Sequence, residues 1–246
     1  MEPALKNFLC GALLVCVSLL TTSASAKEKA TKLTFDFNGQ TRILFAFVPN
    51  REGPLPVVVL LHGSGRDGQI MIEMWKDLAA REGIILAAPN SFNSAEWNTT
   101  LDPPEFLHAV VAQVQATHAI DESRIYLFGH SGGAVYGLLL AIIDSEYFAA
   151  TAVHAGKLLP QFYDAFPYAK QRMPIAIWVG DQDAGFPVTQ VLETKRVMES
   201  NGFHVNVSVI PNHDHNYYGI ANEINSKAWN FLKNAKLKPP AAESQE

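Results

Sequence analysis

The stretch RIYLFGHSGGAVYGLLLAII, residues 124–143, decides the fold of this chain. It begins with a short run of aliphatic and aromatic residues, 125–128, typical of a strand that is buried on both faces of a parallel sheet. It ends with apolar residues at helical spacing, 133–143. Only the sequence GHSGG separates the two patterns. A strand that passes into a helix through so short a connection predicts an α/β fold with a tight turn at Ser131.

The same alternation continues on both sides of this stretch. Short runs of β-branched and aliphatic residues occur at 57–61, 84–88, 151–153, 175–179 and 205–210. Further helical patterns occur at 69–81, 105–117, 188–200 and 217–232. Two alternating stretches, 31–37 and 41–48, come first, and Asn38-Gly39 between them supplies the positive φ of a hairpin turn. We therefore expect a mostly parallel sheet with helices on both faces and an antiparallel hairpin at its start.

Residues 1–26 are typical of a secretory signal peptide. Lys6 is followed by an apolar run, 8–20, and then by small residues that end at Ala26. The apolar run is too short to span a bilayer as a mature helix. We expect cleavage after Ala26 and a secreted or periplasmic protein without a stable membrane anchor. A retained anchor and a lipoprotein at Cys16 are the alternatives.

Composition narrows the possible partners and chemistry. The chain has 24 acidic and 19 basic residues, a formal net charge of -5. This balance argues against a nucleic acid partner, because phosphate binding needs a basic surface. Both cysteines lie within residues 1–26, so the mature chain has no thiol for a disulfide, a cysteine nucleophile or a zinc thiolate site. Without a repeat or a long linker, the sequence predicts one domain, 27–236, and a solvated tail, 237–246.

The turn at Ser131 has the GxSxG spacing of a serine nucleophile. At a sharp apex between a strand and a helix, the residues two before and two after the serine nearly collide, and Gly129 and Gly133 relieve that clash. The amide of Gly132 then lies at a helix N-terminus, where it can donate to an oxygen that becomes negatively charged. Ser131 is therefore the candidate nucleophile, and Gly132 is a candidate oxyanion-hole donor.

A second glycine-rich stretch, LHGSGRDG at residues 61–68, follows the first predicted parallel strand. Its glycines let backbone amides approach a ligand closely, so we expect Ser64 or Gly65 to supply the other oxyanion-hole donor. The alternative is that these glycines only turn the strand into the next helix. His62 is expected to be structural.

A serine hydroxyl needs a base to take its proton and a carboxylate to orient that base. Asp181 and Asp183 directly follow the predicted strand 175–179, and His213 and His215 follow the last predicted strand. Both pairs fit the chain order serine, acid, histidine. A metal site built from the sequence HDH at 213–215 is disfavoured, because no further cluster of ligands is near in the sequence.

The sequence IDESRIYLFGHSGGA, residues 120–134, resembles a segment of secreted polyhydroxybutyrate depolymerases and feruloyl esterases. LHGSG, the Asp183 loop and HDHNYY extend the resemblance over nearly the whole mature chain. The resemblance implies an α/β-hydrolase fold and a carboxylesterase that needs no cofactor. This sequence departs from the depolymerases by lacking a substrate-binding module, a linker and the cysteines often found in the mature enzymes.

The resemblance also ranks the candidate residues. It implies a catalytic triad of Ser131, Asp183 and His215, because Asp183 matches the GxxD pattern of such hydrolases and His215 lies at the expected distance past the last strand. Asp181 remains the rival acid, and His213 remains the rival base.

The segment before the predicted strand 175–179 is where related hydrolases usually insert a lid. Residues 157–174 are too few for a large cap, so we expect an open mouth. Trp97, Phe186 and Tyr217 are the predicted substrate-binding residues of this mouth, with Phe162 beside them. Each of these aromatic residues could equally belong to the core.

An open mouth lined by aromatic residues favours an ester substrate, small or polymeric, with a feruloyl, aryl or short acyl group. The expected reaction is acyl transfer through a covalent intermediate on Ser131. A serine peptidase of the prolyl oligopeptidase type is the second hypothesis. A non-catalytic binding protein on the same fold is the third.

Overall fold

The computed structural model describes residues 30–237 as a single sheet with helices on both faces. The predicted signal peptide, 1–26, and residues 238–246 of the predicted tail lie outside the described residues. Within the described part of the chain, the strands are β1 Thr31–Phe37, β2 Gln40–Phe47, β3 Leu55–Leu61, β4 Ile85–Pro89, β5 Ile120–His130, β6 Ala150–His154, β7 Pro174–Gly180 and β8 His204–Ile210. The helices are α1 Gly68–Glu82, α2 Pro104–Gln115, α3 Gly132–Ile143, η1 Pro160–Tyr168, α4 Val188–Ser200 and α5 Ala221–Leu232.

The strand order across the sheet is β1-β2-β4-β3-β5-β6-β7-β8. β1, β2 and β4 pair antiparallel, and every pair from β4 through β8 is parallel. The hairpin between β1 and β2 turns at Asn38 and Gly39, which have φ values of 53° and 76°. The predicted fold class, a mostly parallel sheet with an antiparallel entry, is confirmed.

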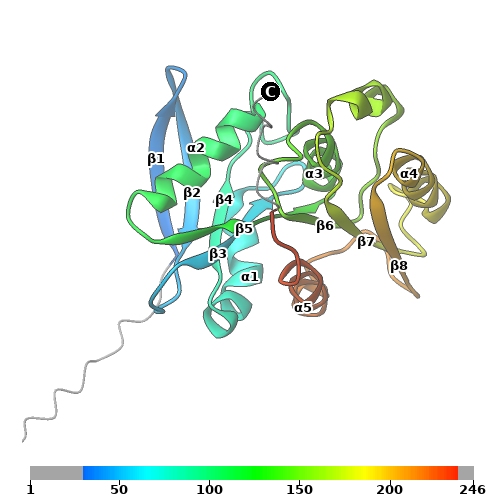
Figure 1. Cartoon of the computed structure of the whole chain (residues 1–246). Helices are drawn as coiled ribbons and strands as arrows, with labels where there is room; N and C mark the ends of the chain where they lie inside the picture. The colour runs from blue at the N-terminus through cyan, green and yellow to red at the C-terminus, as the bar shows by residue number, and fades with distance from the viewer. Residues whose placement is uncertain (1–29, 238–246) are drawn as a thin grey trace, which may run out of the picture.

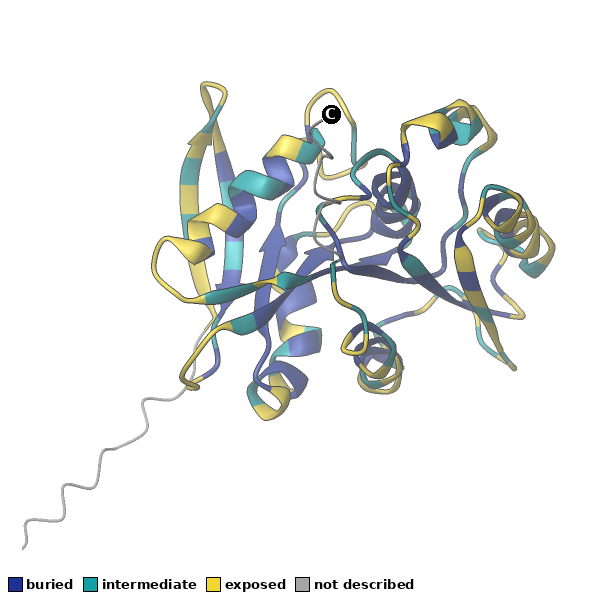
Figure 2. Cartoon of the chain, viewed as in Figure 1, coloured by how far each residue is buried: buried dark blue, intermediate teal, exposed yellow. Residues whose placement is uncertain are grey.

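Two apolar cores, one on each face, hold the helices against the sheet. Along β3, Val57 and Val59 pack into the core beneath α2, α3 and α4, whereas Val58 and Leu60 pack into the core beneath α1 and α5. This alternation follows from the two-residue period of a strand. Figure 1 shows α1 and α5 on one side of the sheet and the other α-helices on the opposite side. Figure 2 shows that the central strands are buried along most of their length.

The structure differs from the sequence-based expectation in three elements. β5 begins at Ile120, because its first residues extend the sheet beyond a register shift opposite residues 55–57 of β3. The last helix begins at Ala221, since the predicted start at Tyr217 lies in a turn that the Ile220 amide closes on the Tyr217 carbonyl. The connection between β6 and β7 contains the unpredicted 3-10 helix η1, which carries prolines near both of its ends.

Among the described residues, no large cap is inserted between β6 and β7, because η1 and its flanking loops are the whole connection. Within residues 30–237, no helix combines the length and the apolar character that crossing a bilayer requires.

Candidate active site

Ser131 lies at a strained apex between β5 and α3. Its φ is 55° and its ψ is -119°, a conformation that few residues other than glycine adopt. A Cβ on Gly129 would stand 2.3 Å from the Gly133 carbonyl oxygen, and a Cβ on Gly133 would stand 2.2 Å from the Leu61 carbonyl oxygen. The expectation that these two glycines relieve a clash is confirmed. The strained turn holds the Ser131 hydroxyl above the carboxyl edge of the parallel strands.

The structure brings Ser131, His215 and Asp183 into one hydrogen-bonded chain. The Ser131 Oγ lies 2.9 Å from the His215 Nε2, and the His215 Nδ1 lies 2.8 Å from the Asp183 Oδ2. In this chain the hydroxyl donates to Nε2, and the Nδ1–H donates to the carboxylate. Three segments that are distant in the sequence therefore bring a hydroxyl, an imidazole and a carboxylate to hydrogen-bond distance, the arrangement that a serine nucleophile requires.

The Asp183 carboxylate is buried and hydrogen-bonded on both oxygens. Its Oδ1 accepts the amides of Gly185 and Phe186, each at 2.9 Å, while Oδ2 faces His215. Burial alone would raise the pKa of Asp183, but the hydrogen bonds from His215 and from the two amides outweigh it and lower the pKa below the ordinary value. The carboxylate is therefore ionised at neutral pH, as a group that orients an imidazole must be.

The rival residues, Asp181 and His213, form a hydrogen bond with each other and none with the hydrogen-bonded side chains of Ser131, His215 and Asp183. The Asp181 Oδ1 accepts the backbone amide of His213 at 3.3 Å, and the Gln182 amide donates to the His213 carbonyl oxygen at 2.9 Å. The His213 ring packs edge-on against His154. Asp181 thus braces the segment that carries His215. No three histidine or acidic side chains among residues 30–237 are arranged to hold a metal ion.

Ser64 and Gly65 are the two alternative donors predicted in the glycine-rich loop, and only one of their backbone amides is available for an oxyanion. The Gly65 amide donates to the Ser94 carbonyl oxygen at 2.7 Å, so it is already paired and the prediction that Gly65 supplies the oxyanion donor is wrong. The Ser64 amide has no hydrogen-bond partner among the described residues, and it lies 3.5 Å from the point where a Cβ on Gly132 would stand. The Gly132 amide lies in the first turn of α3, where a helix leaves its amides unpaired.

His62 connects the glycine-rich loop after β3 to the segment after β4. Its Nδ1 lies 2.9 Å from the Gly63 carbonyl oxygen, and its Nε2 accepts the Ser91 amide at 3.0 Å. Burial lowers the pKa of His62, so the ring is neutral and carries its proton on Nδ1. Both ring nitrogens are satisfied within the protein, which fits a structural role.

The aromatic residues predicted at the mouth have different environments. Phe186 is half-buried and stacks on the His215 ring, with centroids 5.6 Å apart. Trp97 stacks on Tyr136 and donates its Nε1–H to the His62 carbonyl oxygen at 2.9 Å. Tyr217 is fully buried, and its hydroxyl donates to the Asn225 Oδ1 at 2.6 Å.

The prediction that Tyr217 binds substrate is therefore wrong, because its ring lies in the core between the sheet and α5. Its neighbour Tyr218 is the tyrosine that reaches the site. Phe162, on η1, is partly buried against the core of the opposite face. The sequence PNHDHNYY, residues 211–218, did not reveal which tyrosine points inward, because the segment forms a turn and not a regular strand or helix.

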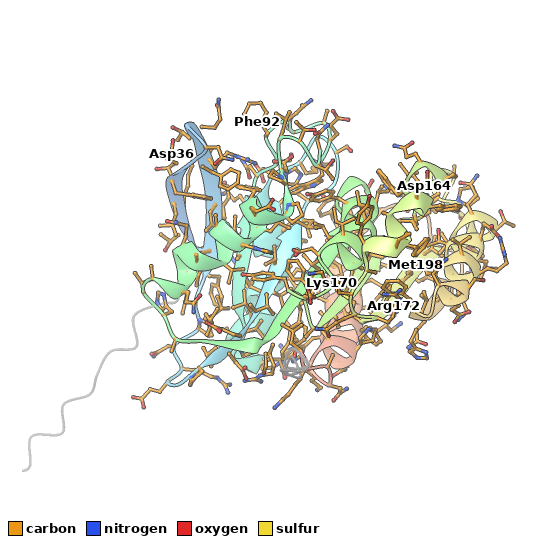
Figure 3. All side chains as sticks on the ribbon, turned by 45° about the horizontal axis from the view of Figure 1, so that its top comes forward. Asp36, Phe92, Asp164, Lys170, Arg172 and Met198 are labelled. Carbon is orange, nitrogen blue, oxygen red and sulfur yellow. The ribbon has the colours of Figure 1, made fainter. Side chains whose placement is uncertain are left out.

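A cavity of about 340 Å³ opens beside Ser131 and His215. Its walls come from the glycine-rich loop after β3 and from the segment after β8; they are Gly63, Ser64, Arg66, His130, Ser131, Asp214, His215, Asn216 and Tyr218. Four of these residues were not predicted as site residues from the sequence, although each lies within one of the motifs LHGSGRDG, GHSGG and HDHNYY: Arg66, His130, Asn216 and Tyr218. A second cavity of about 640 Å³ shares Arg66 and reaches Phe92, which Figure 3 labels.

Comparison with known proteins relates the chain to a family. Residues 92–236, more than half of the chain, match the sequence profile of the dienelactone hydrolase family. No curated protein matches the sequence.

Several solved structures share the fold. An S-formylglutathione hydrolase from Staphylococcus aureus aligns with a TM-score of 0.72 at 16% identity, covering 84% of this chain and 97% of the other. A ferulic acid esterase from Anaeromyces mucronatus aligns with a TM-score of 0.68 at 17% identity, covering 87% and 93%. An acylaminoacyl peptidase from Pyrococcus horikoshii aligns with a TM-score of 0.65 at 15% identity, covering 89% and 43%. These similarities confirm the predicted α/β-hydrolase fold.

Proposed function

Because the chain belongs to the dienelactone hydrolase family, we propose that it is a serine carboxylesterase that works through an acyl-enzyme intermediate. The observation that carries this proposal is the hydrogen-bonded chain from the Ser131 Oγ through His215 to Asp183. The position of Ser131 beside two free amides suits acyl transfer. The serine hydroxyl attacks the carbonyl carbon of the substrate while the amides stabilise the negative charge on the carbonyl oxygen.

In the proposed first half-reaction, His215 Nε2 takes the Ser131 proton while the Ser131 Oγ forms a bond to the ester carbonyl carbon. The carbonyl oxygen becomes negatively charged and accepts hydrogen bonds from the Gly132 and Ser64 amides. The bond to the alcohol oxygen then breaks, and His215 gives its proton to the leaving alcohol. Asp183 stabilises the imidazolium between these two proton transfers.

In the second half-reaction, His215 removes a proton from water, and the resulting oxygen attacks the acyl-enzyme carbonyl. The bond to the Ser131 Oγ breaks, the serine recovers its proton from His215, and the carboxylic acid leaves. No cofactor takes part in either step.

We favour esters with an aryl, feruloyl or short acyl group as substrates. A modest cavity, the Phe186 ring beside His215 and the absence of a large cap support a small acyl or alcohol group near the serine. A ferulic acid esterase is among the proteins of similar fold, which makes a feruloyl ester a sensible first choice.

The test compares the purified protein with its Ser131→Ala variant on p-nitrophenyl acetate, p-nitrophenyl butyrate and methyl ferulate. We expect the variant to lose activity by at least about 10⁴-fold, because the nucleophile is gone. Ser208→Ala, at an exposed serine of β8, is the matched control and should keep full activity. A fluorophosphonate should label the parent protein and leave the Ser131→Ala variant unlabelled. Equal rates in both proteins would refute the proposal.

A peptidase is the second candidate, because an acylaminoacyl peptidase is among the similar folds. That similarity covers only 43% of the peptidase chain. Parallel assays on aminoacyl p-nitroanilides decide between the two activities. An esterase should hydrolyse the esters and leave the anilides intact.

We also propose that the protein is exported and cleaved after Ala26. The support is the sequence of residues 1–26, with one basic residue, an apolar run and small residues before the cleavage point. The mass of the protein recovered outside the cytoplasm tests this proposal, since cleavage after Ala26 predicts a chain that begins at Lys27.

A further inference from the structure

Two histidines outside the hydrogen-bonded chain lie beside it. His130 is the last residue of β5 and directly precedes Ser131, and its ring centroid lies 5.0 Å from that of His215. His154 is the last residue of β6 and pairs with His130 in the sheet. Both side chains are buried. The chemistry proposed above gives neither of them a role.

The two rings meet through one nitrogen each. The His154 Nδ1 lies 3.2 Å from the His130 Nδ1, which is itself 3.3 Å from the His154 carbonyl oxygen. That carbonyl oxygen already accepts the Ser131 amide at 3.1 Å. The His154 Nε2 is buried and has no hydrogen-bond partner among the described residues. A neutral imidazole has one N–H and one lone pair, so only one of the two facing nitrogens can donate.

Both rings are neutral at neutral pH. Burial, reinforced by His215, lowers the pKa of His130 to about 3. Burial, reinforced by His130 and His213, lowers the pKa of His154 to about 3. The contact between the rings is therefore a hydrogen bond between two neutral imidazoles, and its direction fixes the tautomer of each.

The unpaired nitrogen of His154 decides that direction. If the His130 Nδ1 donated, His154 would carry its own proton on Nε2, where an N–H would be buried without an acceptor. If the His154 Nδ1 donates, only a lone pair is buried there, which folded proteins tolerate better than an orphaned N–H. The second arrangement sets the His130 Nδ1 lone pair 3.3 Å from the His154 carbonyl oxygen, but that oxygen already accepts the Ser131 amide, so the buried Nε2 of His154 decides. The second arrangement is favoured, and it leaves the proton of His130 on Nε2.

The Cδ2–Nε2 edge of His130 borders the glycine-rich loop, which forms one wall of the active-site cavity. His130 lines the cavity together with Ser131 and His215, and no described residue pairs with its Nε2. The adjacent Cδ2 lies 3.3 Å from the point where a Cβ on Gly63 would stand, so this edge of the ring borders the glycine-rich loop. A donor at this place would contact a bound ester next to the reacting carbonyl.

We propose that His130 positions the substrate by donating its Nε2–H to an oxygen other than the reacting carbonyl oxygen, and that His154 holds His130 in this tautomer. This inference rests on the proposed esterase function and narrows its substrates. It selects esters that carry a further oxygen acceptor close to the scissile bond, on the acyl or the alcohol side.

The first test reads the tautomers directly in the unmodified protein. In a ¹⁵N-histidine-labelled sample, the two-bond ¹H–¹⁵N correlations distinguish a protonated Nε2 from a protonated Nδ1. We expect the Nε2–H pattern for His130 and the Nδ1–H pattern for His154, with signals assigned by their loss in His130→Gln and His154→Leu variants. The opposite pair of patterns would overturn the proposal, whatever the enzymatic activity of the protein.

The second test uses ester pairs that differ by one oxygen. The acyl-side pair is p-nitrophenyl methoxyacetate and p-nitrophenyl butyrate, and the alcohol-side pair is 2-methoxyethyl acetate and butyl acetate. The ratio of kcat/KM within each pair is compared between the parent protein and its variants, which cancels the intrinsic reactivity of each ester. We expect His130→Leu to lower the ratio for one pair by about 3- to 10-fold, the usual range for one lost hydrogen bond.

His130→Gln is the conservative variant, because its amide nitrogen reaches about as far as Nε2, and it should keep most of the preference. His204→Leu, at an exposed histidine of β8, is the control and should change neither ratio. His154→Leu should lower the same ratio as His130→Leu, since His130 can then carry its proton on Nδ1 instead of Nε2 and donate it to the carbonyl oxygen of residue 154. Unchanged ratios in an active His130→Leu variant would overturn the role of His130 and leave the esterase proposal standing.

Discussion

The turn that carries Ser131 and the segment that carries His215 are positioned in different ways. Residues 129–133 are packed against backbone on two sides, and the Ser131 amide is fixed to the carbonyl oxygen of His154. Residues 211–216 lie largely at the surface and are held by a few contacts from the loop after β7. Tight backbone packing in the core therefore fixes the position of Ser131, whereas a few hydrogen bonds from the loop after β7 hold the segment of His215.

This difference predicts how each segment responds to damage. The serine turn cannot move without displacing strands, so a clash there should act on stability. The segment of His215 can shift outward into solvent, so a clash there should act on activity and leave the fold intact. Variants in the two segments should therefore separate effects on stability from effects on activity.

Gly133→Ala should abolish folding or lower the free energy of unfolding by more than about 3 kcal/mol. Its Cβ would stand 2.2 Å from the Leu61 carbonyl oxygen, which belongs to the central strand β3 and cannot withdraw. Urea unfolding followed by circular dichroism measures the change.

Gly132→Ala is the matched control, because its Cβ would meet the Ser64 Oγ at 2.7 Å, the end of a side chain that can rotate. It should remain folded and lose activity through the disturbed oxyanion site. A stable Gly133→Ala protein would contradict the rigid serine turn.

Asp183→Asn should lower kcat by about 10⁴-fold, the size of the effect when the carboxylate of a serine triad becomes an amide. The amide would favour the wrong tautomer of His215 and leave its positive charge unsupported. Steady-state kinetics on a p-nitrophenyl ester measures the loss.

Asp181→Asn keeps the Asp183–His215 contact and weakens only the bond to the His213 amide. We expect it to lower kcat by less than about 10-fold. Comparable losses in both variants would mean that the brace matters as much as the hydrogen-bonded chain.

Gly180→Ala should lower kcat by about 100-fold and change stability by less than about 1 kcal/mol. A Cβ there would stand 2.0 Å from the His213 carbonyl oxygen, so the segment must move away from β7, and a displacement of about 1 Å in a catalytic group has an effect of this size. Kinetics and urea unfolding on the same sample separate the two quantities. A large loss of stability would show that this segment is as rigid as the serine turn.

The same contrast explains what the sequence predicted and what it did not. The strand, GHSGG and helix pattern is local, so it predicted the tight turn at Ser131 and the close backbone approach at Gly129 and Gly133. Tyr217 lies in a turn whose orientation is set by the core against α5, and no periodic pattern within PNHDHNYY records that contact.

The glycine-rich stretch after the first parallel strand predicts a donor at Ser64 or Gly65, and the structure excludes Gly65. Its amide is paired with Ser94, which lies in an irregular loop about 30 residues further along the chain. Contacts between two loops depend on the tertiary structure of both loops. The positions of glycines in the sequence do not predict these contacts. The same holds for Asp181 and Asp183, two aspartates on either side of Gln182. Their contacts distinguish them, because Asp181 accepts the His213 amide and Asp183 contacts the His215 ring.

The smallest expected effect is a pH-dependent contribution of Asp183 to stability. Its pKa in the folded protein lies below the ordinary value of 3.8, so the contribution is fully present above that value and is lost as the pH falls toward the folded pKa. The difference in unfolding free energy between the parent protein and Asp183→Asn should therefore shrink as the pH is lowered below about 4.

Asp164→Asn provides the reference for this titration. Asp164 is exposed on η1, is labelled in Figure 3, and makes no hydrogen bond or ion pair with any other described residue. Its difference from the parent protein over the same pH range shows the effect of removing an exposed aspartate that accepts no such hydrogen bonds. If the Asp183→Asn difference stayed constant, the hydrogen bonds from His215, Gly185 and Phe186 would not favour the ionised carboxylate. The brace of the histidine segment would then be the main contribution of this loop to the site.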